Sequence, residues 1–325
     1  MTRPRVYISR RVPDATLALL QDHCELDIWP EDVAPPRARF LDALTQADGA
    51  ITMLTERVDQ EALDAAPLLR VVSNFAVGYD NIEVPAATAR GIPVGNTPGV
   101  LTETCADHAF ALLLAAARRI NEGERYIHAG EWKTWSPLQL LGQEVNGATL
   151  GIIGFGRIGQ AVARRARGFR MRILYSGSPK PEAAALGAEN VSLDDLLARS
   201  DFISLHVPLS SQTRHMIGRE QLARMKSSAI LINTARGPVI DQDALVEALR
   251  EGRIWRAALD VTTPEPLPLD HPLLSLPNCL VVPHLASATR YTRERMGHIA
   301  AENLLAGLRG DRLIHCVNPE VYERR

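Results

Sequence analysis

The sequence predicts an α/β protein of two doubly wound parallel-sheet domains, with one domain inserted into the other. Short apolar runs alternate with helix-like stretches over the first hundred residues, and a second alternating set begins near residue 149. A helical tail, residues 292–308, follows the second set. With 325 residues and 46% hydrophobic content, the chain is long enough for two cores.

The first set is typical of βα units on a parallel sheet. Its expected strands are residues 6–9, 24–28, 50–52 and 71–74, with a helix over 15–23. The second set has six expected strands, which fit a dinucleotide-binding Rossmann fold. They are residues 150–153, 172–175, 202–205, 229–232, 257–260 and 280–282.

Glycine and proline mark the junction between the sets, at residues 91–93 and 97–99, and one long helix is expected over 102–126. We therefore expect residues 1–98 and 287–325 to form a flavodoxin-like substrate domain. Residues 99–286 would be the inserted NAD(P)-binding domain.

Composition excludes several classes of function. A net charge of -2 gives no reason to expect nucleic acid or an anionic membrane as a partner. The longest apolar run, residues 109–117, is too short to span a bilayer. The four cysteines are dispersed and no cluster has metal-ligand spacing, so we expect reduced thiols, no metal and a cytoplasmic protein.

A glycine-rich loop lies between an apolar strand and a helix-like segment, in the sequence GIIGFGRIG at residues 151–159. Gly154 would allow the tight turn, Gly156 would admit a pyrophosphate, and Gly159 would let helix and strand pack closely. Arg157 and Ile158 lie within the loop and are expected to contact the cofactor. The alternative is a tight turn that binds nothing.

The segment after the next strand bears on the choice of nicotinamide. NAD-binding folds usually place an acid there, but no acidic residue occurs between Gly154 and Pro181. Ser176, Gly177, Ser178 and Lys180 would instead accommodate a 2′-phosphate. We expect NADP(H) to be preferred, with NAD(H) possible if this loop is merely polar.

Three candidate reacting groups follow late strands. Arg236 comes after residues 229–232, Glu265 after 257–260, and His284 after 280–282. Ligands of open α/β sheets bind beyond the carboxyl ends of the strands, so these side chains should share one edge. Thr234 and Ala235, just before Arg236, are expected beside the cofactor.

This set suits the reduction of a 2-oxo acid by a nicotinamide. His284 can donate a proton near neutral pH, and Glu265 would orient its ring and favour the imidazolium. The planar fork of Arg236 suits a carboxylate. Each residue alone could be structural. Of the other histidines, His206 and His215 lack a paired acid nearby in sequence, and His108 is expected to be packed in the core.

At this point the sequence resembles the D-isomer-specific 2-hydroxyacid dehydrogenases. The similarity rests on residues 151–159, 231–237 (LINTARG), 258–266 (ALDVTTPEP) and 283–289 (PHLASAT), and it covers essentially the whole chain. Within the family, residues 261–268, 271–274, 303–310 and 132–135 look closest to the glyoxylate/hydroxypyruvate reductases.

The resemblance implies Arg236, Glu265 and His284 as the catalytic set, with Asp260 holding the nicotinamide amide. It further implies that Val77 and Gly78 present backbone N–H groups to the substrate carboxylate. The remaining implied contacts are Leu54 and Ser287 lining the site, Thr104 near the nicotinamide or phosphates, and Pro208 beside the ring.

The resemblance also implies a homodimer formed through the nucleotide-binding domain and an extended arm. Trp135 would reach the neighbouring active site or serve only as an aromatic contact of the dimer. Two other functions stay open: a dehydrogenase of another small 2-hydroxy acid or phosphite, and a nucleotide-sensing corepressor-like scaffold.

Overall fold

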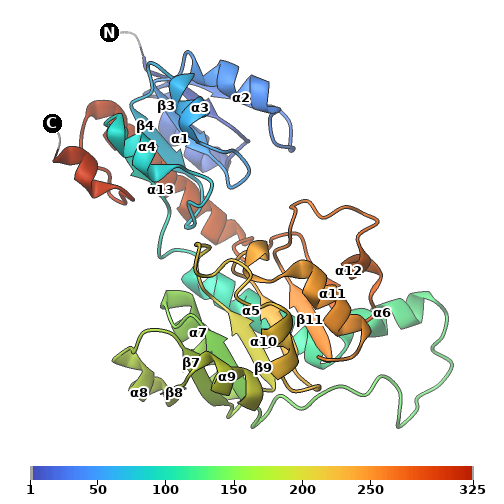
Figure 1. Ribbon diagram of the computed structural model, residues 1–325. Helices are drawn as coiled ribbons and strands as arrows, with labels where there is room; N and C mark the ends of the chain where they lie inside the picture. Colours follow the sequence, from blue (N-terminus) through green and yellow to red (C-terminus); the bar gives the residue numbers. More distant parts are fainter. Residues whose placement is uncertain (1–2, 324–325) are drawn as a thin grey trace. The chain divides into compact units, whose positions relative to one another are not determined.

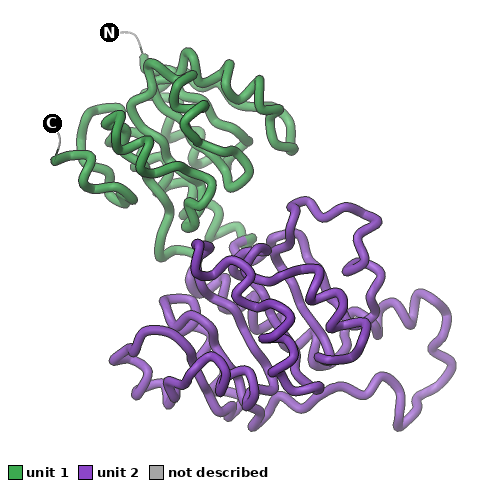
Figure 2. The backbone as a smooth tube through the Cα atoms, viewed as in Figure 1, with its two compact units in different colours: residues 1–101, 288–325 green, residues 102–287 purple. Residues whose placement is uncertain are grey.

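The computed structural model describes residues 3–323 and divides into two compact units (Figure 2). Unit 1 comprises residues 1–101 and 288–325, and unit 2 comprises residues 102–287. The division falls three residues beyond the expected first boundary and one beyond the second, so Ser287 belongs to unit 2. The chain thus crosses between the units twice.

Unit 1 holds a five-stranded parallel sheet in the order β2-β1-β3-β4-β5, which is the order of flavodoxin-like folds. Its strands are β1 (Arg5–Ile8), β2 (Glu25–Ile28), β3 (Gly49–Thr52), β4 (Val71–Asn74) and β5 (Val94–Gly95). The sequence did not predict β5, because two residues ending in glycine give no periodic signal. β3 and β4 are buried throughout and form the centre of the sheet.

The helices of unit 1 cover this sheet. They are α1 (Asp14–Gln21), α2 (Arg37–Leu44), α3 (Gln60–Asp64), α4 (Val84–Ala89) and α13 (Arg290–Arg309), with a short 3-10 turn at Pro319–Tyr322. The C-terminal α13 packs on α1, β3 and β4 (Figure 1). The tail of the chain therefore completes the first domain, as expected from the helical pattern of residues 292–308.

Unit 2 holds a seven-stranded parallel sheet in the order β12-β11-β10-β9-β6-β7-β8, a doubly wound order of the Rossmann type. Its strands are β6 (Thr149–Ile153), β7 (Arg172–Ser176), β8 (Ala188–Asn190), β9 (Phe202–Leu205), β10 (Ile230–Asn233), β11 (Arg256–Leu259) and β12 (Cys279–Val281). The six expected strands are present. The seventh, β8, is a short and largely exposed edge strand, so it lacks an apolar pattern.

The helices of unit 2 are α5 (Thr102–Ala117), α6 (Ile120–His128), α7 (Arg157–Gly168), α8 (Glu182–Leu186), α9 (Leu193–Arg199), α10 (Arg219–Arg224), α11 (Gln242–Arg250) and α12 (Pro272–Ser275), with a 3-10 turn at Gly237–Val239. The expectation of one helix over 102–126 was wrong. Arg119 adopts a left-handed conformation with φ of 54°, which ends α5 and starts α6 in a new direction. α5 packs on α7, β10 and β11 and is mostly buried.

Candidate functional site

The three candidate reacting residues lie beyond the carboxyl ends of adjacent strands in unit 2. β10 ends at Asn233, β11 at Leu259 and β12 at Val281, and these strands are neighbours in register. Arg236, Glu265 and His284 each follow one of them within six residues. Parallel pairing places these segments at one edge of the sheet, as the strand pattern predicts.

His284 and Glu265 form a direct pair. Nδ1 of His284 lies 2.9 Å from Oε2 of Glu265, and the two side chains are 29% and 35% exposed. The other carboxylate oxygen, Oε1, accepts a hydrogen bond of 2.9 Å from the Thr262 backbone N–H. Glu265 is thus held at both oxygens, and it leaves Nε2 of His284 for a ligand. Nδ1 then carries the proton that Glu265 accepts.

Asp260 shapes the turn that carries His284. Its carboxylate accepts from the backbone N–H groups of Leu285, at 2.6 Å, and Ala286, at 3.0 Å. The His284 N–H donates to the Asp260 carbonyl at 2.9 Å, and His284 itself has a φ of 53°. A histidine in the left-handed region is strained, and these bonds hold it there. Asp260 therefore has a structural task besides the cofactor contact that the resemblance implied.

His108 is not simply packed in the core, as the sequence analysis expected. Its Nε2 lies 3.0 Å from Oδ1 of Asp260, and its side chain is 19% exposed. Burial raises the pKa of Asp260, but the hydrogen bonds from His108, Leu285 and Ala286 outweigh it, and the pKa lies below its usual range. The apolar pattern of α5 concealed this pair because its partner comes 152 residues later.

The turn that carries Arg236 is built on a buried asparagine. Asn233 is 1% exposed, its Oδ1 accepts from the Ala235 N–H at 3.0 Å, and its Nδ2 donates to the Arg236 carbonyl at 2.9 Å. Arg236 Nη1 also donates to the Ala235 carbonyl at 2.8 Å. The next residue, Gly237, packs directly on the Thr262 backbone. The arginine turn and the Glu265 loop are therefore in contact.

The glycines of the 151–159 loop have distinct roles. Gly154 has a φ of 93°, and a β-carbon there would lie 2.6 Å from the His206 carbonyl oxygen. Gly159 packs on the Gly154 carbonyl, so helix α7 sits close to the strand. A β-carbon on Gly156 would meet nothing within 4 Å. Packing does not require glycine at 156, but close approach of a ligand would.

The start of helix α7 and the segment after β10 have further features that fit a bound dinucleotide. Helix α7 starts at Arg157, so the N–H groups of Arg157, Ile158 and Gly159 form its free first turn, which favours phosphate. The Thr234 hydroxyl oxygen is buried with no hydrogen-bond partner among the described residues. Such an orphaned group is what a bound cofactor would satisfy. The neighbouring Ala235 is buried at 9% exposure.

The polar loop after β7 is tied to the core. Tyr175 is 2% exposed, stacks on Phe155 at 4.1 Å between ring centres, and accepts from the Lys180 backbone N–H at 3.2 Å. Asn190 donates to the Gly177 carbonyl at 3.3 Å. The side chains of Ser178 and Lys180 are left exposed, and Ser176 is partly buried at the strand end.

The other expected contacts of unit 2 lie on neighbouring segments. Thr104 lies in the first turn of α5, and Ser287 follows the Asp260-bound turn. Pro208 follows β9, with its carbonyl accepting from the Thr213 hydroxyl at 2.7 Å. His206, just before it, bonds Ser204 at 2.8 Å, and burial lowers its pKa to about 4. His206 is therefore uncharged at neutral pH.

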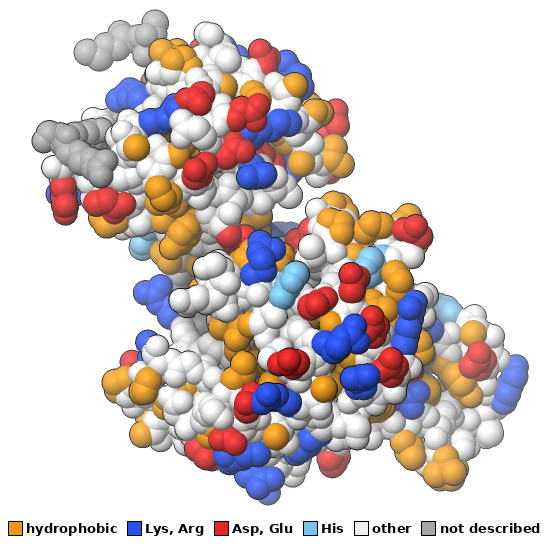
Figure 3. Space-filling model, in the orientation of Figure 1, with side chains coloured by type: hydrophobic (Ala, Val, Ile, Leu, Met, Phe, Trp, Pro, Cys, Tyr) orange, Lys and Arg blue, Asp and Glu red, His pale blue; other side chains and the backbone are white. Residues whose placement is uncertain are grey.

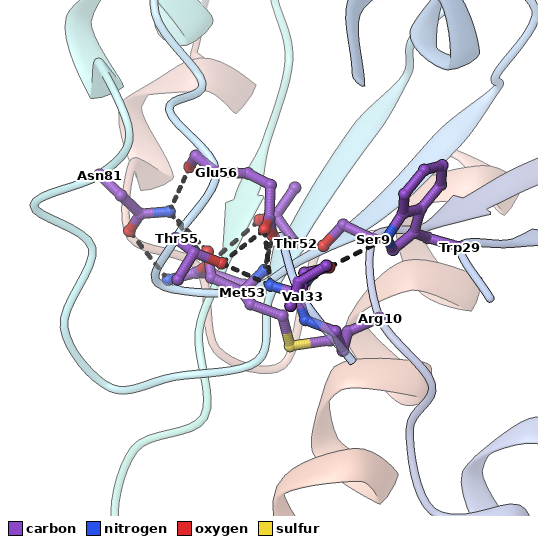
Figure 4. A network of polar contacts seen from close by, with 10 residues as sticks. Ser9, Arg10, Trp29, Val33, Thr52, Met53, Thr55, Glu56 and Asn81 are labelled. Atoms are coloured by element: carbon purple, nitrogen blue, oxygen red, sulfur yellow. Dashed lines mark hydrogen bonds and ion pairs between the residues drawn. The ribbon is translucent and has the colours of Figure 1, made fainter. Parts of the chain in front are cut away.

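Leu54, Val77 and Gly78 belong to unit 1, on the two loops that follow β3 and β4. A polar network ties these loops together (Figure 4). Nδ2 of Asn81 donates to the carbonyls of Met53, at 2.9 Å, and Glu56, at 3.0 Å. Residues 53–56 are thus bound to the loop that carries Val77 and Gly78.

Glu56 anchors the loop that follows β3. Its side chain is 2% exposed, and it accepts from the Met53 N–H at 2.8 Å, from Arg10 at 3.1 Å and from the Ser9 hydroxyl (Figure 4). This network was not predicted from the sequence. The available signal was a run of polar residues at strand ends, but nothing in the sequence pairs residue 9 with residue 56.

Trp135 lies on an extended arm after α6 and is 79% exposed. Other large apolar side chains of α6 and the arm are exposed too, and none of the α6 residues is buried. Figure 3 shows apolar side chains over this part of unit 2. Besides Trp135, the exposed apolar residues of α6 and the arm, with their exposed fractions, are Ile120 (59%), Ile127 (56%), Trp132 (60%), Leu138 (77%) and Leu141 (57%).

Two features of residues 3–323 bear on other functions. No helix in this range is long and apolar enough to cross a membrane. Within the same range, no group of three or more His, Cys, Asp or Glu side chains could hold a metal ion.

Comparisons with known proteins identify the family to which this chain is similar. The sequence model of one protein family, the D-isomer specific 2-hydroxyacid dehydrogenase NAD-binding domain, matches residues 110–286. A glyoxylate reductase of Korarchaeum cryptofilum is 53% identical, covering 99% of this chain and 98% of the relative.

Solved structures are similar over almost the whole chain. A protein of Thermus thermophilus has a TM-score of 0.91 and 47% identity, covering 96% of this chain and 99% of that one. An NADPH-dependent glyoxylate/hydroxypyruvate reductase of Sinorhizobium meliloti, solved with NADP and malonate, has a TM-score of 0.84 and 33% identity, covering 97% of each chain.

Proposed function

Because the chain belongs to the D-isomer specific 2-hydroxyacid dehydrogenase family, we propose that it reduces glyoxylate and hydroxypyruvate to glycolate and D-glycerate. Unit 2 binds the nicotinamide cofactor, and unit 1 supplies the loops that hold the substrate carboxylate. The observation that carries the proposal is the His284–Glu265 pair, at 2.9 Å, beyond the strand ends of a Rossmann sheet. Full-length similarity to glyoxylate reductases supports the choice of substrate.

The residues divide the reaction between them. A bound nicotinamide supplies the hydride. His284 gives a proton from Nε2 to the carbonyl oxygen of the substrate as that oxygen becomes a hydroxyl. Glu265 holds the ring through Nδ1. Arg236 binds the carboxylate and polarises the carbonyl with its guanidinium fork.

Further residues contribute by position. Leu54, on the loop after β3, and Ser287, after the Asp260-bound turn, are each proposed to contact a short acid. Trp135 would do so from a second subunit or serve only as an aromatic contact of the dimer. Pro208 and Thr104 would lie beside a bound nicotinamide. Asp260 would hold the amide of a bound nicotinamide with the lone pairs that its donors, His108, Leu285 and Ala286, leave free.

NADP(H) is the preferred cofactor, with NAD(H) also used. The loop of residues 176–180 has no acidic side chain to repel a 2′-phosphate, and Ser178 and Lys180 are exposed there. Gly156 leaves room for the pyrophosphate, and Thr234 offers an unsatisfied hydroxyl. The relative from Sinorhizobium meliloti, which is NADPH-dependent, supports the same assignment.

The protein is a homodimer formed through unit 2. The exposed apolar side chains of α6 and the arm would otherwise face water in one continuous segment, residues 120–141. A buried ion pair fixes α6 in place: Arg256 of β11, 5% exposed, contacts Glu122, 12% exposed. The apolar residues of α6 are thereby kept on the outside. One chain has a mass of 35.6 kDa, and light scattering should give twice this value. The double variant Trp132→Ser, Ile127→Ser should be monomeric.

We assign the protein to the cytoplasm. The support is that all four cysteines are free thiols, as is usual in a reducing compartment.

The experiment that tests the function is oxidation of reduced nicotinamide, followed by absorbance, with glyoxylate or hydroxypyruvate and with NADPH or NADH in parallel. Faster oxidation of NADPH with either acid is expected. Turnover only with another small 2-oxo acid would overturn the substrate assignment. No turnover with any acid, despite cofactor binding, would favour the scaffold function.

A further inference from the structure

The loop after β4 offers two adjacent N–H groups that its own fold does not use. Among residues 3–323, neither the Val77 nor the Gly78 N–H has an acceptor. Both residues are partly exposed, whereas residues 71–76 before them are buried. Successive unpaired N–H groups form a site for an anion. The proposed function, on which this inference rests, gives these groups to the substrate carboxylate.

The carbonyl groups of this loop are all restrained. The Ala76 carbonyl accepts from the Thr97 N–H at 2.8 Å, and the Val77 carbonyl accepts from Nδ2 of Asn96 at 2.9 Å. The Gly78 carbonyl accepts from Nδ2 of Asn74 at 2.8 Å. In a planar trans peptide the N–H points opposite to the carbonyl before it. Thr97 therefore aims the Val77 N–H, and Asn96 aims the Gly78 N–H.

Asn96 is well placed to do this because its own backbone is fixed. Its carbonyl accepts from Nδ2 of Asn303 at 3.0 Å, and its N–H donates to the His315 carbonyl at 3.3 Å. Asn303 is fully buried, and its Oδ1 accepts from the His315 N–H at 3.0 Å. Helix α13 and the C-terminal segment thus hold Asn96 against the loop.

We propose that Asn96 is a positioning residue for the substrate carboxylate. It binds the Val77 carbonyl, and so directs the Gly78 N–H outward without touching the substrate. Without that bond the Val77–Gly78 peptide can rotate, and one of the two donors leaves the carboxylate. Binding of the 2-oxo acid weakens as a result, whereas binding of the cofactor, which occurs in unit 2, is unaffected.

The test compares Asn96→Leu and Asn96→Ser with the wild type. Leucine has nearly the same shape but no donor, and serine keeps a hydroxyl that can donate. With glyoxylate, the KM of Asn96→Leu should rise roughly three- to tenfold, as expected for one lost hydrogen bond, and Asn96→Ser should recover part of it. The Kd of oxamate, an unreactive 2-oxo acid mimic, should rise by the same factor in calorimetry with cofactor present, while the KM for NADPH stays unchanged.

Asn318→Leu is the matched control. Asn318 is a fully buried asparagine of the same unit, but its amide binds Ile92, Thr88 and Val94 instead of the loop. It should lower the melting temperature without raising the KM for glyoxylate. An unchanged KM and oxamate Kd in Asn96→Leu, or equal changes in Asn318→Leu, would overturn the proposal.

The outcome also separates this inference from the proposed function. A wild type that reduces glyoxylate, with an Asn96→Leu variant of unchanged KM, refutes only the role of Asn96. A wild type that reduces no 2-oxo acid refutes the proposed function, and the oxamate Kd then still decides whether Asn96 orients the anion site. Should Asn96→Leu fail to fold, Asn96→Ser and Asn96→Ala supply the same comparison, with serine expected to bind more tightly.

Discussion

Gly237→Ala should disable the enzyme without touching a reacting group. Gly237 follows Arg236, and it packs on the loop that leads to Glu265. A β-carbon at this position would lie 2.7 Å from Oγ1 of Thr263, and closer still to the carbonyl carbon and oxygen of Thr262. Ordinary contact begins at 3.4 Å, so relief of the Thr263 contact alone requires about 0.7 Å of separation, and relief of the closer Thr262 backbone contacts requires more than that. The contacted atoms are largely backbone, which cannot simply rotate away.

The separation moves Arg236 away from the Glu265–His284 pair. Misplacement by about 1 Å costs roughly 100-fold in rate, and overpacking costs about 1–3 kcal/mol of stability. We therefore expect kcat/KM with glyoxylate to fall about 100-fold, with the Kd of NADPH, from fluorescence titration, nearly unchanged.

The matched control is Gly168→Ala, at the end of α7. A β-carbon there meets nothing within 4 Å, so activity and stability should stay at the wild-type level. If Gly237→Ala retained kcat/KM within twofold, the contact between the arginine and glutamate loops would not be what positions the site.

Three other outcomes are expected. His284→Ala should reduce turnover about 100-fold or more and leave the Kd of NADPH unchanged, and wild-type turnover would refute proton donation by this residue. Ser176→Asp should shift kcat/KM from NADPH towards NADH by about tenfold, the effect of ~1.4 kcal/mol of repulsion between a carboxylate and the 2′-phosphate; an unmoved ratio would place phosphate recognition elsewhere. Burial raises the pKa of Cys279 to about 12, so the folded state keeps its proton where the unfolded chain loses it, and stability falls as the pH rises from about 8.5 towards 12. The free energy of unfolding, measured in urea, should therefore fall less steeply with pH in Cys279→Ala than in the wild type, by up to about 1.4 kcal/mol per pH unit over this window. Equal slopes in the two proteins would show that the thiol does not contribute.

The two histidines of the site illustrate how local signals and distant contacts divide the information. His284 stands beyond a short apolar strand, where a parallel sheet is known to place ligand-binding residues, and its position could be predicted from the sequence. His108 lies in an apolar helix, so its sequence surroundings suggest a core residue. Its hydrogen bond to Asp260 forms only because α5 packs on β11.

The sequence by itself determined the two parallel α/β units, the insertion of one into the other, the glycine-rich loop and the three candidate reacting residues. The strands, the glycine-rich loop and the reacting residues depend on periodicity and on spacing within about ten residues, which the chain carries locally. The insertion follows from the order of these segments along the chain, with a helical tail after the second set. The sequence could not determine β5, β8 or the break at Arg119, since short or polar elements have no periodic pattern.

Only the tertiary structure decided which groups bind one another across the chain. The Asn81 amide reaches Met53, Glu56 meets Ser9, and Asn96 binds Val77, although each pair is separated by 19 to 47 residues. Such pairs depend on the strand order of the sheet, which brings consecutive loops to one edge. Hydrogen-bonding side chains are common at strand ends, so the sequence alone cannot say which of them meet.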